Sequence, residues 1–409
     1  MLYDLLLILG KFGVTVASVF NKKAALWCKG QKGLLENVES SMRGVEGNVV
    51  WFHCASLGEF EQGRPLIEDW KDKNPADSIV LTFFSPSGYE VRKNYKGADH
   101  VFYLPLDISY NARAFVRAIN PKCAIFIKYE YWNNYTKELQ KIGAKSYVVS
   151  AIFRENDTFF RPWGGLYANI LRRYDRLFLQ NESSRELLHK IGIDNTTVCG
   201  DTRFDRVANL EKSIKIIPKV EAFTANEDVF IVGSSWPKDD EITIDLIGLF
   251  PKMKFIIVPH EIDEAKIVSI VDRCEALGRK TVRYSKDEDL GVCADASVMV
   301  IDVIGVLSST YHYCKYAYIG GGFGVGIHNT LEAATFGLPI IFGPNYKRFD
   351  EAIGLVDNQI ATPIASVEEA HKWLAEMSED GELYKKTSAA AKMFVSQNSG
   401  ATKEILRHI

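Results

Sequence analysis

Short apolar runs alternate with amphipathic stretches along most of the chain, and this alternation restricts the fold more than any other feature of the sequence. In the first half, six apolar or β-branched runs predict strands at residues 49–54, 78–84, 100–103, 124–127, 145–150 and 176–180. Continuous apolar strands are typical of parallel sheets that helices cover on both faces. Helices are predicted between them, at residues 61–71, 109–119, 132–142, 162–174 and 182–191. The pattern therefore indicates an α/β domain.

A second series of the same kind follows a polar stretch. It predicts strands at residues 229–232, 255–258, 281–284, 298–301, 316–319 and 339–342, and helices at 261–277, 330–336 and throughout 367–409. We therefore predict two Rossmann-like α/β domains that face each other across a cleft. The boundaries that we assign are an N-terminal segment at 1–33, a first domain at 34–206, a linker at 207–227, a second domain at 228–390 and a C-terminal helix at 391–409.

The composition excludes several classes of protein. A chain of 409 residues favours two domains of ordinary size. The formal net charge of −3 argues against a dedicated nucleic-acid binder, whose surface would be basic. The 7 cysteines are scattered without a C-x-x-C pair, as expected for reduced thiols in a cytosolic compartment. No metal-ligand spacing occurs, and Asp287 and Asp289 lie in a charged run that most simply forms a solvated loop, so we predict neither a metal nor another cofactor.

The N-terminus is apolar and is followed by a basic cluster. Residues 1–20 carry only two charged side chains, Asp4 and Lys11, and lysines follow at positions 22, 23, 29 and 32. The segment lacks the basic start and the small-residue cleavage site of a signal peptide. Its two charges make a bilayer-spanning helix costly. We expect an apolar helix in the membrane interface with lysines on anionic headgroups, and the alternative is a first helix packed on the domain core.

A carboxylate lies at the first predicted strand-to-helix turn. Residues 50–60 read as an apolar strand that enters a small-residue turn and then a helix, which places Glu59 at the junction. Open α/β sheets bind ligands at such strand ends. Glu59 is therefore a candidate general base, a capping residue at the helix N-terminus, or both. His53 lies within the strand and is expected to be packed rather than catalytic.

A glycine-rich loop in the second half is the densest candidate site. Five glycines occur within seven residues after the strand that ends at Ile319, and a helix begins near Asn329. Glycines allow close backbone approach to a ligand, and a helix N-terminus favours phosphate. Glu332 would accept hydrogen bonds from a ribose diol, or would only complete an N-terminal cap. Because neither a G-x-G-x-x-G fingerprint nor a P-loop occurs, a nucleotide-sugar site is the natural candidate.

Other polar positions follow predicted strands, where an ordinary βα loop is the alternative to a ligand site. In the second domain these include Gly233–Trp236, Pro259–Glu261 and Asp302–Val306. In the first domain, hydroxyls follow one strand at Ser85 and Ser87, and Glu130 follows another. Arg203 is a candidate anion clamp, although a surface ion pair with Asp201 or Asp205 would also explain it.

Five of these motifs occur in the order of a known family. They are Ala55-Ser56-Leu57-Gly58-Glu59, Ser85-Pro86-Ser87-Gly88, Glu130-Tyr131-Trp132, Gly200-Asp201-Thr202-Arg203-Phe204-Asp205 and His328-Asn329-Thr330-Leu331-Glu332-Ala333-Ala334. The chain resembles the 3-deoxy-D-manno-octulosonic acid (Kdo) transferases of Gram-negative bacteria. The resemblance implies a GT-B fold whose last helix returns to the first domain. It also implies inverting transfer of Kdo from CMP-Kdo to a lipid A precursor, at the cytoplasmic face of the inner membrane.

The resemblance also implies roles for individual residues. Glu59 matches the proton acceptor, and Glu130 and Arg203 match positions that support the transition state. The segments that hold CMP are matched by Pro259, His260, Ile304, Gly305, Val306, Asn329, Thr330, Leu331 and Glu332. The remaining residues that we predict to contact substrate are Ser56, Ser85, Ser87, Gly88, Ser234, Ser235, Gly321 and Gly322.

The chain departs from the family at four positions. Many members carry an acid at Lys128, a proline at Asn133 and an arginine at His260, and Val306 replaces a polar residue. Two other classes of function remain open: a GT-B enzyme that uses a UDP-sugar on a membrane or cell-wall acceptor, and a non-catalytic, membrane-associated nucleotide-binding module. A dehydrogenase is the weakest alternative, because the glycine pattern is wrong for a dinucleotide.

Overall fold

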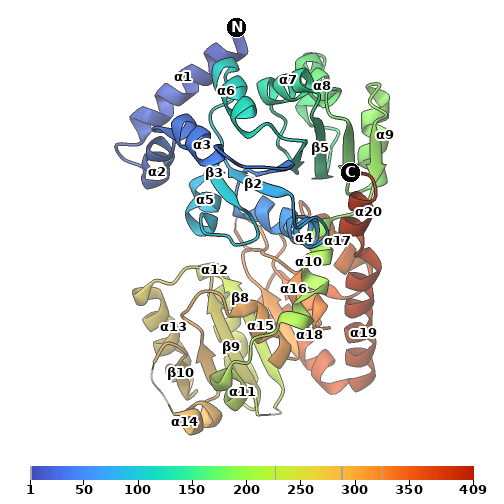
Figure 1. The fold of residues 1–409 in the computed structure, drawn as a ribbon. Coiled ribbons are helices and arrows are strands. Elements are labelled where there is room, and N and C mark those ends of the chain that lie inside the picture. Colours follow the sequence, from blue (N-terminus) through green and yellow to red (C-terminus); the bar gives the residue numbers. More distant parts are fainter. Residues whose placement is uncertain (1, 226, 287–288, 325) are drawn as a thin grey trace. The chain divides into compact units, whose positions relative to one another are not determined.

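The computed structural model describes all residues except 1, 226, 287–288 and 325, so the predicted loop residue Asp287 lies outside it. The chain forms two compact units, Met1–Arg206 with Ser399–Ile409, and Val207–Asn398. Each unit contains a 7-stranded sheet in which every pair of neighbouring strands is parallel, which confirms the predicted pair of parallel-sheet α/β domains (Figure 1).

The first sheet has the strand order β3-β2-β1-β4-β5-β6-β7. Its strands are β1 (Val49–Cys54), β2 (Ser78–Phe83), β3 (His100–Tyr103), β4 (Cys123–Ile127), β5 (Lys145–Ala151), β6 (Arg176–Leu179) and β7 (Thr196–Val198). The six predicted strands are confirmed to within one residue at each end. The short edge strand β7 was not predicted, because its 3 half-buried residues carry no apolar run.

Strand β1 separates two hydrophobic cores. Its alternate residues Val49 and Trp51 pack in one cluster, whereas Val50, Phe52 and Cys54 pack in another on the opposite face. All 6 residues of β1 are buried, as expected for a central strand of a parallel sheet.

Helices of the first unit cover both faces of its sheet. They are α1 (Leu2–Ala17), α2 (Lys22–Gly30), α3 (Leu34–Met42), α4 (Leu57–Lys73), α5 (Pro86–Arg92), α6 (Ser109–Ile119), α7 (Asn133–Ile142), α8 (Gly165–Leu171), α9 (Glu182–Lys190), α10 (Thr202–Ala208), which ends just beyond the unit, and α20 (Ala401–Leu406). Two predictions need correction. The helix expected at 61–71 begins at Leu57, because its first turn is capped. The helix expected at 162–174 is shorter, since a 3₁₀ turn at Thr158–Phe160 precedes it.

The second sheet has the order β10-β11-β9-β8-β12-β13-β14. Its strands are β8 (Val229–Ser235), β9 (Lys254–Pro259), β10 (Thr281–Arg283), β11 (Val298–Val300), β12 (Tyr316–Ile319), β13 (Ile340–Phe342) and β14 (Ala361–Pro363). The helices of this unit are α11 (Pro218–Thr224), α12 (Pro237–Leu249), α13 (Glu264–Ala276), α14 (Leu290–Asp295), α15 (Leu307–Thr310), α16 (Leu331–Thr335), α17 (Asp350–Asp357), α18 (Val367–Glu379) and α19 (Gly381–Asn398). The three-residue edge strand β14 was not predicted.

The structure differs from the sequence-based boundaries at two places. The stretch 207–227 contains α11, whose Val220 and Phe223 are buried, and it belongs to the second unit. The C-terminal region, predicted to be helical throughout, consists of three helices that break near Asp380 and at Gly400, whose φ of 118° is left-handed.

The final helix, α20, is held in the first unit by a carboxylate and an apolar contact. Asp205 accepts hydrogen bonds from the backbone N–H groups of Gly400 and Thr402 at the start of α20. Ile405 is fully buried in the same core cluster as Phe52. Asp205 therefore holds the returning end of the chain.

Helix α1 turns its polar side chains toward the domain and its apolar side chains outward. The Tyr3 hydroxyl donates to Asp107 at 2.7 Å, and the Asp4 carboxylate accepts from the Ser109 hydroxyl at 2.6 Å and from the Asn134 amide at 2.9 Å. No residue of α1 is buried. Large apolar side chains are exposed along the segment at Leu2, Leu5, Leu6, Ile8, Leu9, Phe12, Val14, Val16, Val19 and Phe20. This orientation is the reverse of a helix packed on a core.

The length of α1 bears on whether this helix could span a membrane. Among the described residues, no helix is both long enough and apolar enough to cross a bilayer. In Figure 1, α1 lies at the periphery of the first unit, beside α2 and α6.

The buried carboxyl that anchors α1 makes stability depend on pH. Burial raises the pKa of Asp107 to about 6, although hydrogen bonds from Tyr3 and from the backbone of Asn134 and Tyr135 oppose the shift. The folded carboxyl therefore holds its proton more tightly than the unfolded one. Its contribution to the free energy of unfolding is highest below about pH 4 and falls by about 3 kcal/mol as the pH rises through 6.

We predict that Asp107→Asn removes this fall. Urea denaturation of both proteins between pH 4 and 7.5 should give curves that diverge over this window, and parallel curves would contradict the prediction. In Tyr3→Phe the Asp107 carboxyl loses a hydrogen bond that lowers its pKa, so the fall should extend to higher pH.

Candidate active site

Glu59 lies on the first turn of α4 and is fixed there by Ser56. The backbone N–H of Ser56 donates to Glu59 Oε2 at 3.0 Å, and the Ser56 hydroxyl donates to the same oxygen. This is a capping-box arrangement, and it explains why α4 begins at Leu57. Oε1 of Glu59 has no hydrogen-bond partner within the described part of the chain. Capping and proton transfer would therefore use different oxygens of one carboxylate.

The serine turn after β2 lies directly beside the Glu59 turn. The Ser85 N–H donates to the Ala55 carbonyl at 2.7 Å, which joins the two turns. The Ser85 hydroxyl caps α5 by accepting from the Ser87 N–H, and the two serine hydroxyls lie 2.9 Å apart. Gly88 is required for packing, since a Cβ there would collide with the Phe83 ring. The structure thus brings the predicted residues Ser56, Ser85 and Ser87 together.

Glu130 ends a hydrogen-bonded chain that begins in the core. Its Oε2 lies 3.0 Å from His53 Nε2 and 2.9 Å from Trp132 Nε1. The other ring nitrogen of His53 lies 2.8 Å from the Thr82 hydroxyl, which also accepts from Trp51 Nε1 at 2.8 Å. Because the indole N–H only donates, the Thr82 proton is available for His53 Nδ1. In that tautomer, His53 Nε2 carries the proton and donates to Glu130.

Sequence reasoning missed the role of His53. As predicted, His53 is packed, with no exposed surface. Thr82 belongs to β2 and Glu130 lies in the loop after β4, and no local sequence pattern links either of them to His53. One signal could have indicated this role. Trp51 and His53 lie two residues apart, so they share one face of the strand, and both carry a ring nitrogen that can form hydrogen bonds.

Arg203 forms the ion pair that the sequence left open, but with a buried partner. Its Nη2 lies 2.7 Å and its Nε 2.8 Å from Asp201 Oδ2, while Gln62 of α4 donates to the other carboxylate oxygen at 3.2 Å. Burial raises the pKa of Asp201, but Arg203 and Lys128 outweigh it and hold the pKa below its usual range. The pair is therefore a buried clamp that fixes the guanidinium and not a surface contact.

The three predicted catalytic residues lie around one edge of the first sheet. Burial raises the pKa of the Cys54 thiol well above its ordinary value, and the nearby carboxylates of Glu59 and Glu130 raise it further. Burial likewise raises the pKa of Tyr129, while the charges of Arg154 and Arg203 oppose the shift. Glu59 follows β1, Glu130 follows β4 and Arg203 follows β7, so all three come after the carboxyl ends of strands in one parallel sheet.

Several cations at this edge were not predicted as site residues. Arg92 and Arg206 each hold an oxygen of Glu61 at 2.9 Å. Lys128, which stands where many relatives carry an acid, has a left-handed φ of 68°, and its Nζ lies 5.1 Å from the centre of the Tyr129 ring. These side chains come from elements far apart in the sequence, so spacing alone carries no signal for them.

In the second unit, a buried carboxylate holds the glycine loop. Asp239 accepts hydrogen bonds from the Tyr318 hydroxyl at 2.6 Å, the Gly321 N–H at 2.7 Å and the Trp236 N–H at 2.9 Å. The Gly321 N–H is therefore engaged by protein rather than directed at a ligand. A Cβ at Gly322 would collide with the backbone of Gly343. Close packing therefore accounts for part of the glycine content that the sequence attributed to phosphate binding.

Three rings stack where the loops after β8, β9 and β12 meet. His260 lies 4.7 Å from Trp236 and 4.3 Å from His328, centre to centre, and Trp236 Nε1 donates to His328 Nε2 at 2.8 Å. Burial and the neighbouring His260 lower the pKa of His328 to about 4. The predicted residues Ser234, Ser235 and Pro259 precede these rings in the chain.

Two cations lie against these loops and were also missed. Lys266 donates to the Ser235 carbonyl at 3.1 Å. The guanidinium of Arg348 lies against Gly326, 3.1 Å from where a Cβ would be. Lys266 and the His260 N–H share the Ser235 carbonyl, which places the charge of Lys266 beside His260.

Glu332 is held from two helices. Its Oε1 accepts from the Asn329 amide at 3.0 Å, and its Oε2 accepts from the Ser308 hydroxyl of α15 at 2.7 Å. The neighbouring Thr330 and Leu331 are buried. This arrangement positions Glu332 more firmly than the simple cap that the sequence left as an alternative. The loop before α15 carries three further predicted residues. Gly305 has a left-handed φ of 91°, Val306 is the N-cap residue of α15, and Ile304 is 90% exposed.

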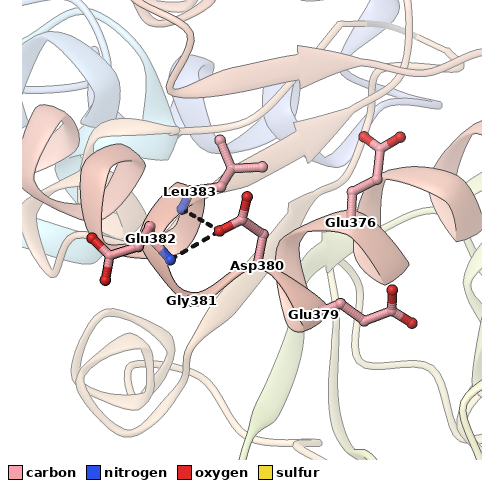
Figure 2. A pocket seen from close by; sticks show the side chains of 6 residues that line it. All are labelled: Glu376, Glu379, Asp380, Gly381, Glu382 and Leu383. Carbon is pink, nitrogen blue, oxygen red and sulfur yellow. Dashed lines mark hydrogen bonds between the residues drawn. The ribbon is translucent and has the colours of Figure 1, made fainter.

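A hollow elsewhere in the second unit does not coincide with these residues. It has a volume of about 770 Å³ and lies between α18 and α19, lined by Glu376, Glu379, Asp380, Gly381, Glu382 and Leu383 (Figure 2). Asp380 caps α19 by accepting from the N–H groups of Glu382 and Leu383, each at 3.0 Å. Figure 2 shows the glutamate side chains pointing in different directions, so they do not converge on a ligand. Across the described residues, no three His, Cys, Asp or Glu side chains are grouped to hold a metal ion.

Comparisons with known proteins show which family this chain is similar to. Residues 29–206 match the family model described as 3-deoxy-D-manno-octulosonic-acid transferase (kdotransferase). A 3-deoxy-D-manno-octulosonic acid transferase of Chlamydia muridarum is 29% identical over 73% of this chain and 71% of that protein. One of Rickettsia bellii is 29% identical over 78% of this chain and 77% of that protein.

A solved structure shares the fold of both units. The UDP-GlcNAc 2-epimerase of Neisseria meningitidis bound to UDP-GlcNAc superposes with a TM-score of 0.62, at 16% identity, over 88% of this chain and 99% of that chain. Two parallel-sheet α/β units of this GT-B-like kind, with polar residues gathered at strand ends and these relatives, define a glycosyltransferase. The chain is similar to Kdo transferases both in this family model and in these two relatives.

We predict that His53 and Glu130 are energetically coupled. His53→Phe keeps an aromatic ring but removes one hydrogen-bond partner from Thr82 and one from Glu130, which should cost about 1–3 kcal/mol in the free energy of unfolding. Glu130→Gln removes the charge from the same contact while keeping an acceptor oxygen. A double-mutant cycle measured by urea denaturation should give a coupling energy above about 0.5 kcal/mol.

The control is a residue on the same strand face that lacks the contact. Val49 lies in the same core cluster as Trp51. The change in the free energy of unfolding caused by Val49→Ala should add independently to that caused by Glu130→Gln. Additive changes in the free energy of unfolding for His53→Phe and Glu130→Gln would contradict the coupling of these two residues.

Proposed function

We propose that the chain transfers Kdo from CMP-Kdo to a lipid A precursor of the lipid IVA type, with inversion of the anomeric centre, in lipopolysaccharide core biosynthesis. The observation that carries the proposal is the state of Glu59. Its carboxylate lies at the ligand-binding edge of the first sheet, with Oε2 held by Ser56 and Oε1 available to a substrate. Similarity to the Kdo transferases supports the choice of sugar.

Glu59 is the general base of this proposal. Hydroxyl attack on an anomeric carbon requires removal of the acceptor proton, and Glu59 Oε1 takes it. The Ser56 N–H and the N-terminus of α4 both direct positive partial charge at this carboxylate. The hydrogen bonds to Oε2 also fix the direction in which Oε1 points.

Glu130 and Arg203 support the transition state. Arg203 stabilises the negative charge on the departing CMP, and Glu130 stabilises the positive charge that develops on the sugar. Arg203 is oriented by Asp201, and a fixed guanidinium is well suited to a phosphate or a carboxylate. Glu130 is oriented by His53 and Trp132. A preoriented charge needs no reorganisation at the moment of reaction, which is how such groups lower a barrier.

The second unit binds CMP in this proposal. Glu332, held by Asn329 and Ser308, accepts the ribose hydroxyls. Lys266 and Arg348 provide positive charge for the phosphate where His260 replaces the arginine of many relatives. No metal is needed for the departure of a monophosphate stabilised in this way.

Helix α1 attaches the enzyme to the cytoplasmic leaflet of the inner membrane. Its apolar side chains point outward while Tyr3 and Asp4 hold it to the domain. Lysines follow at positions 22, 23, 29 and 32, and they favour anionic headgroups. The anchor confines the enzyme to the surface where an amphiphilic acceptor lies.

Glu59→Gln tests the base. Glutamine also completes a capping box, so the variant should fold normally while Kdo transfer falls by about 10²–10⁴-fold. Purified protein is incubated with CMP-Kdo and a tetraacylated lipid A precursor, the lipid is followed by mass spectrometry, and the anomeric configuration of the product is read by NMR. Glu68→Gln, on the exposed side of the same helix, is the matched control and should retain activity.

The outcomes separate the parts of the proposal. Full activity in Glu59→Gln would remove the base assignment. No product from the wild type despite CMP binding would mean that the acceptor is wrong, and no product without CMP binding would favour a UDP-sugar. The number of Kdo mass increments gives the number of residues transferred.

CMP should stabilise the protein and UDP should not. At 100 times its dissociation constant, a ligand that binds only the folded state adds about 2.7 kcal/mol to the free energy of unfolding. Glu332→Gln should weaken CMP binding by about tenfold, because one ribose acceptor is lost. Glu379→Gln in the acidic hollow of Figure 2 is the control and should bind CMP normally. Equal stabilisation by UDP, or loss of the CMP effect in EDTA, would contradict the proposal.

A further inference from the structure

An apolar groove lies between the N-terminal helices and the serine turn. It has a volume of about 450 Å³, within the size range of small-molecule sites. Its walls come from α1, α2 and the loop after β2, and the lining residues are Leu7, Gly10, Lys11, Val14, Lys23, Ala24, Trp27, Phe84, Ser85, Pro86 and Leu106. Most of this surface is carbon, so the groove selects a hydrocarbon occupant rather than a sugar.

We propose that this groove binds one acyl chain of the anionic glycolipid acceptor. The inference rests on the proposed function for the identity of that lipid, and it adds a site for its hydrocarbon part. Three observations specify the occupant: the position of the groove beside the catalytic turn, the charges that line it, and a buried donor in its wall.

Position is the first observation. Ser85 and Pro86 line the groove, and the Ser85 N–H bonds to the Ala55 carbonyl, one residue before the Ser56 that holds Glu59. A chain bound in the groove would therefore present its sugar head at the Glu59 turn. The groove and the base are parts of one continuous surface within the first unit.

Charge is the second observation. Lys11 and Lys23 are exposed and line the groove, whereas its lining includes no acidic side chain. Flexible ammonium groups beside an apolar groove match a lipid that has a hydrocarbon tail and a phosphate on its head. A neutral hydrophobic peptide would make no use of them.

An unsatisfied donor is the third observation. Trp27 is 6% exposed and lines the groove, and its Nε1 has no hydrogen-bond partner within the described part of the chain. A buried indole N–H without an acceptor is costly, and buried indoles normally have one. The carbonyl oxygen of an ester-linked or amide-linked acyl chain supplies an acceptor that a plain hydrocarbon lacks.

Two glycines of α1 allow a matched test. Gly10 lines the groove and Gly13 does not, yet a Cβ at either position would meet no atom within 4 Å. Gly10→Phe therefore fills the groove, and Gly13→Phe adds the same ring elsewhere on the helix. Neither change introduces a clash, and both improve helix propensity.

We expect Gly10→Phe to raise KM for a long-chain acceptor by about tenfold or more, with little change in kcat, because hydrocarbon contacts are lost. It should leave KM for a deacylated acceptor unchanged. Gly13→Phe should resemble the wild type with both acceptors. Equal effects of the two variants, or a wild-type KM that does not depend on the acyl chains, would overturn the proposal.

A second measurement needs no donor and no turnover. Acceptor lipid with brominated acyl chains quenches a nearby indole, so the quenching that is lost in Trp27→Phe reports on the groove. This component should be present in the wild type and in Gly13→Phe and absent in Gly10→Phe. Its absence from the wild type would overturn the groove, whereas quenching without any Kdo transfer would uphold the groove and reject the proposed reaction.

Discussion

The placement of β1 between β2 and β4 is the constraint on which the first domain depends. The sheet order changes direction at this strand, so the connections that leave β1 and its two neighbours diverge and leave a crevice at their carboxyl ends. Glu59 follows β1, Ser85 follows β2 and Glu130 follows β4. His53 also depends on this placement, because its register pairs it with Thr82 on one side and Phe126 on the other.

Periodicity and local chemistry were sufficient to predict the elements but not their long-range contacts. Six of the 7 strands of the first sheet and the Glu59 turn follow from apolar runs and a strand-to-helix junction, which are local signals. The bonds from His53 to Glu130 and from Ser308 to Glu332 span 77 and 24 residues, and they depend on strand order. The edge strands β7 and β14 were not predicted because their residues form no continuous apolar run.

The glycine loop shows how one pattern serves two purposes. Sequence reasoning attributed its glycines to phosphate binding, yet Asp239 takes the Gly321 N–H and Gly343 requires the missing Cβ of Gly322. Glycine content therefore reports close backbone packing here as much as ligand approach. The groups that remain for a nucleotide lie beside the loop, in Glu332, Lys266 and the ring stack of His260, and they come from separate elements.

Helix α1 is a second case in which the sequence predicts the composition of an element but not its long-range contacts. Its apolar composition is plain in the sequence, but the two polar residues Tyr3 and Asp4 decide which way that apolar surface faces. Because their partners Asp107 and Ser109 lie about a hundred positions further along the chain, only the fold shows that the helix is held by its polar side. Those bonds leave most apolar side chains of the helix exposed, and Leu7 alone of its leucines packs partly against the core of the first unit. Its hydrophobic surface is therefore available to a lipid, and so is the groove that it shares with α2 and the serine turn beside Glu59.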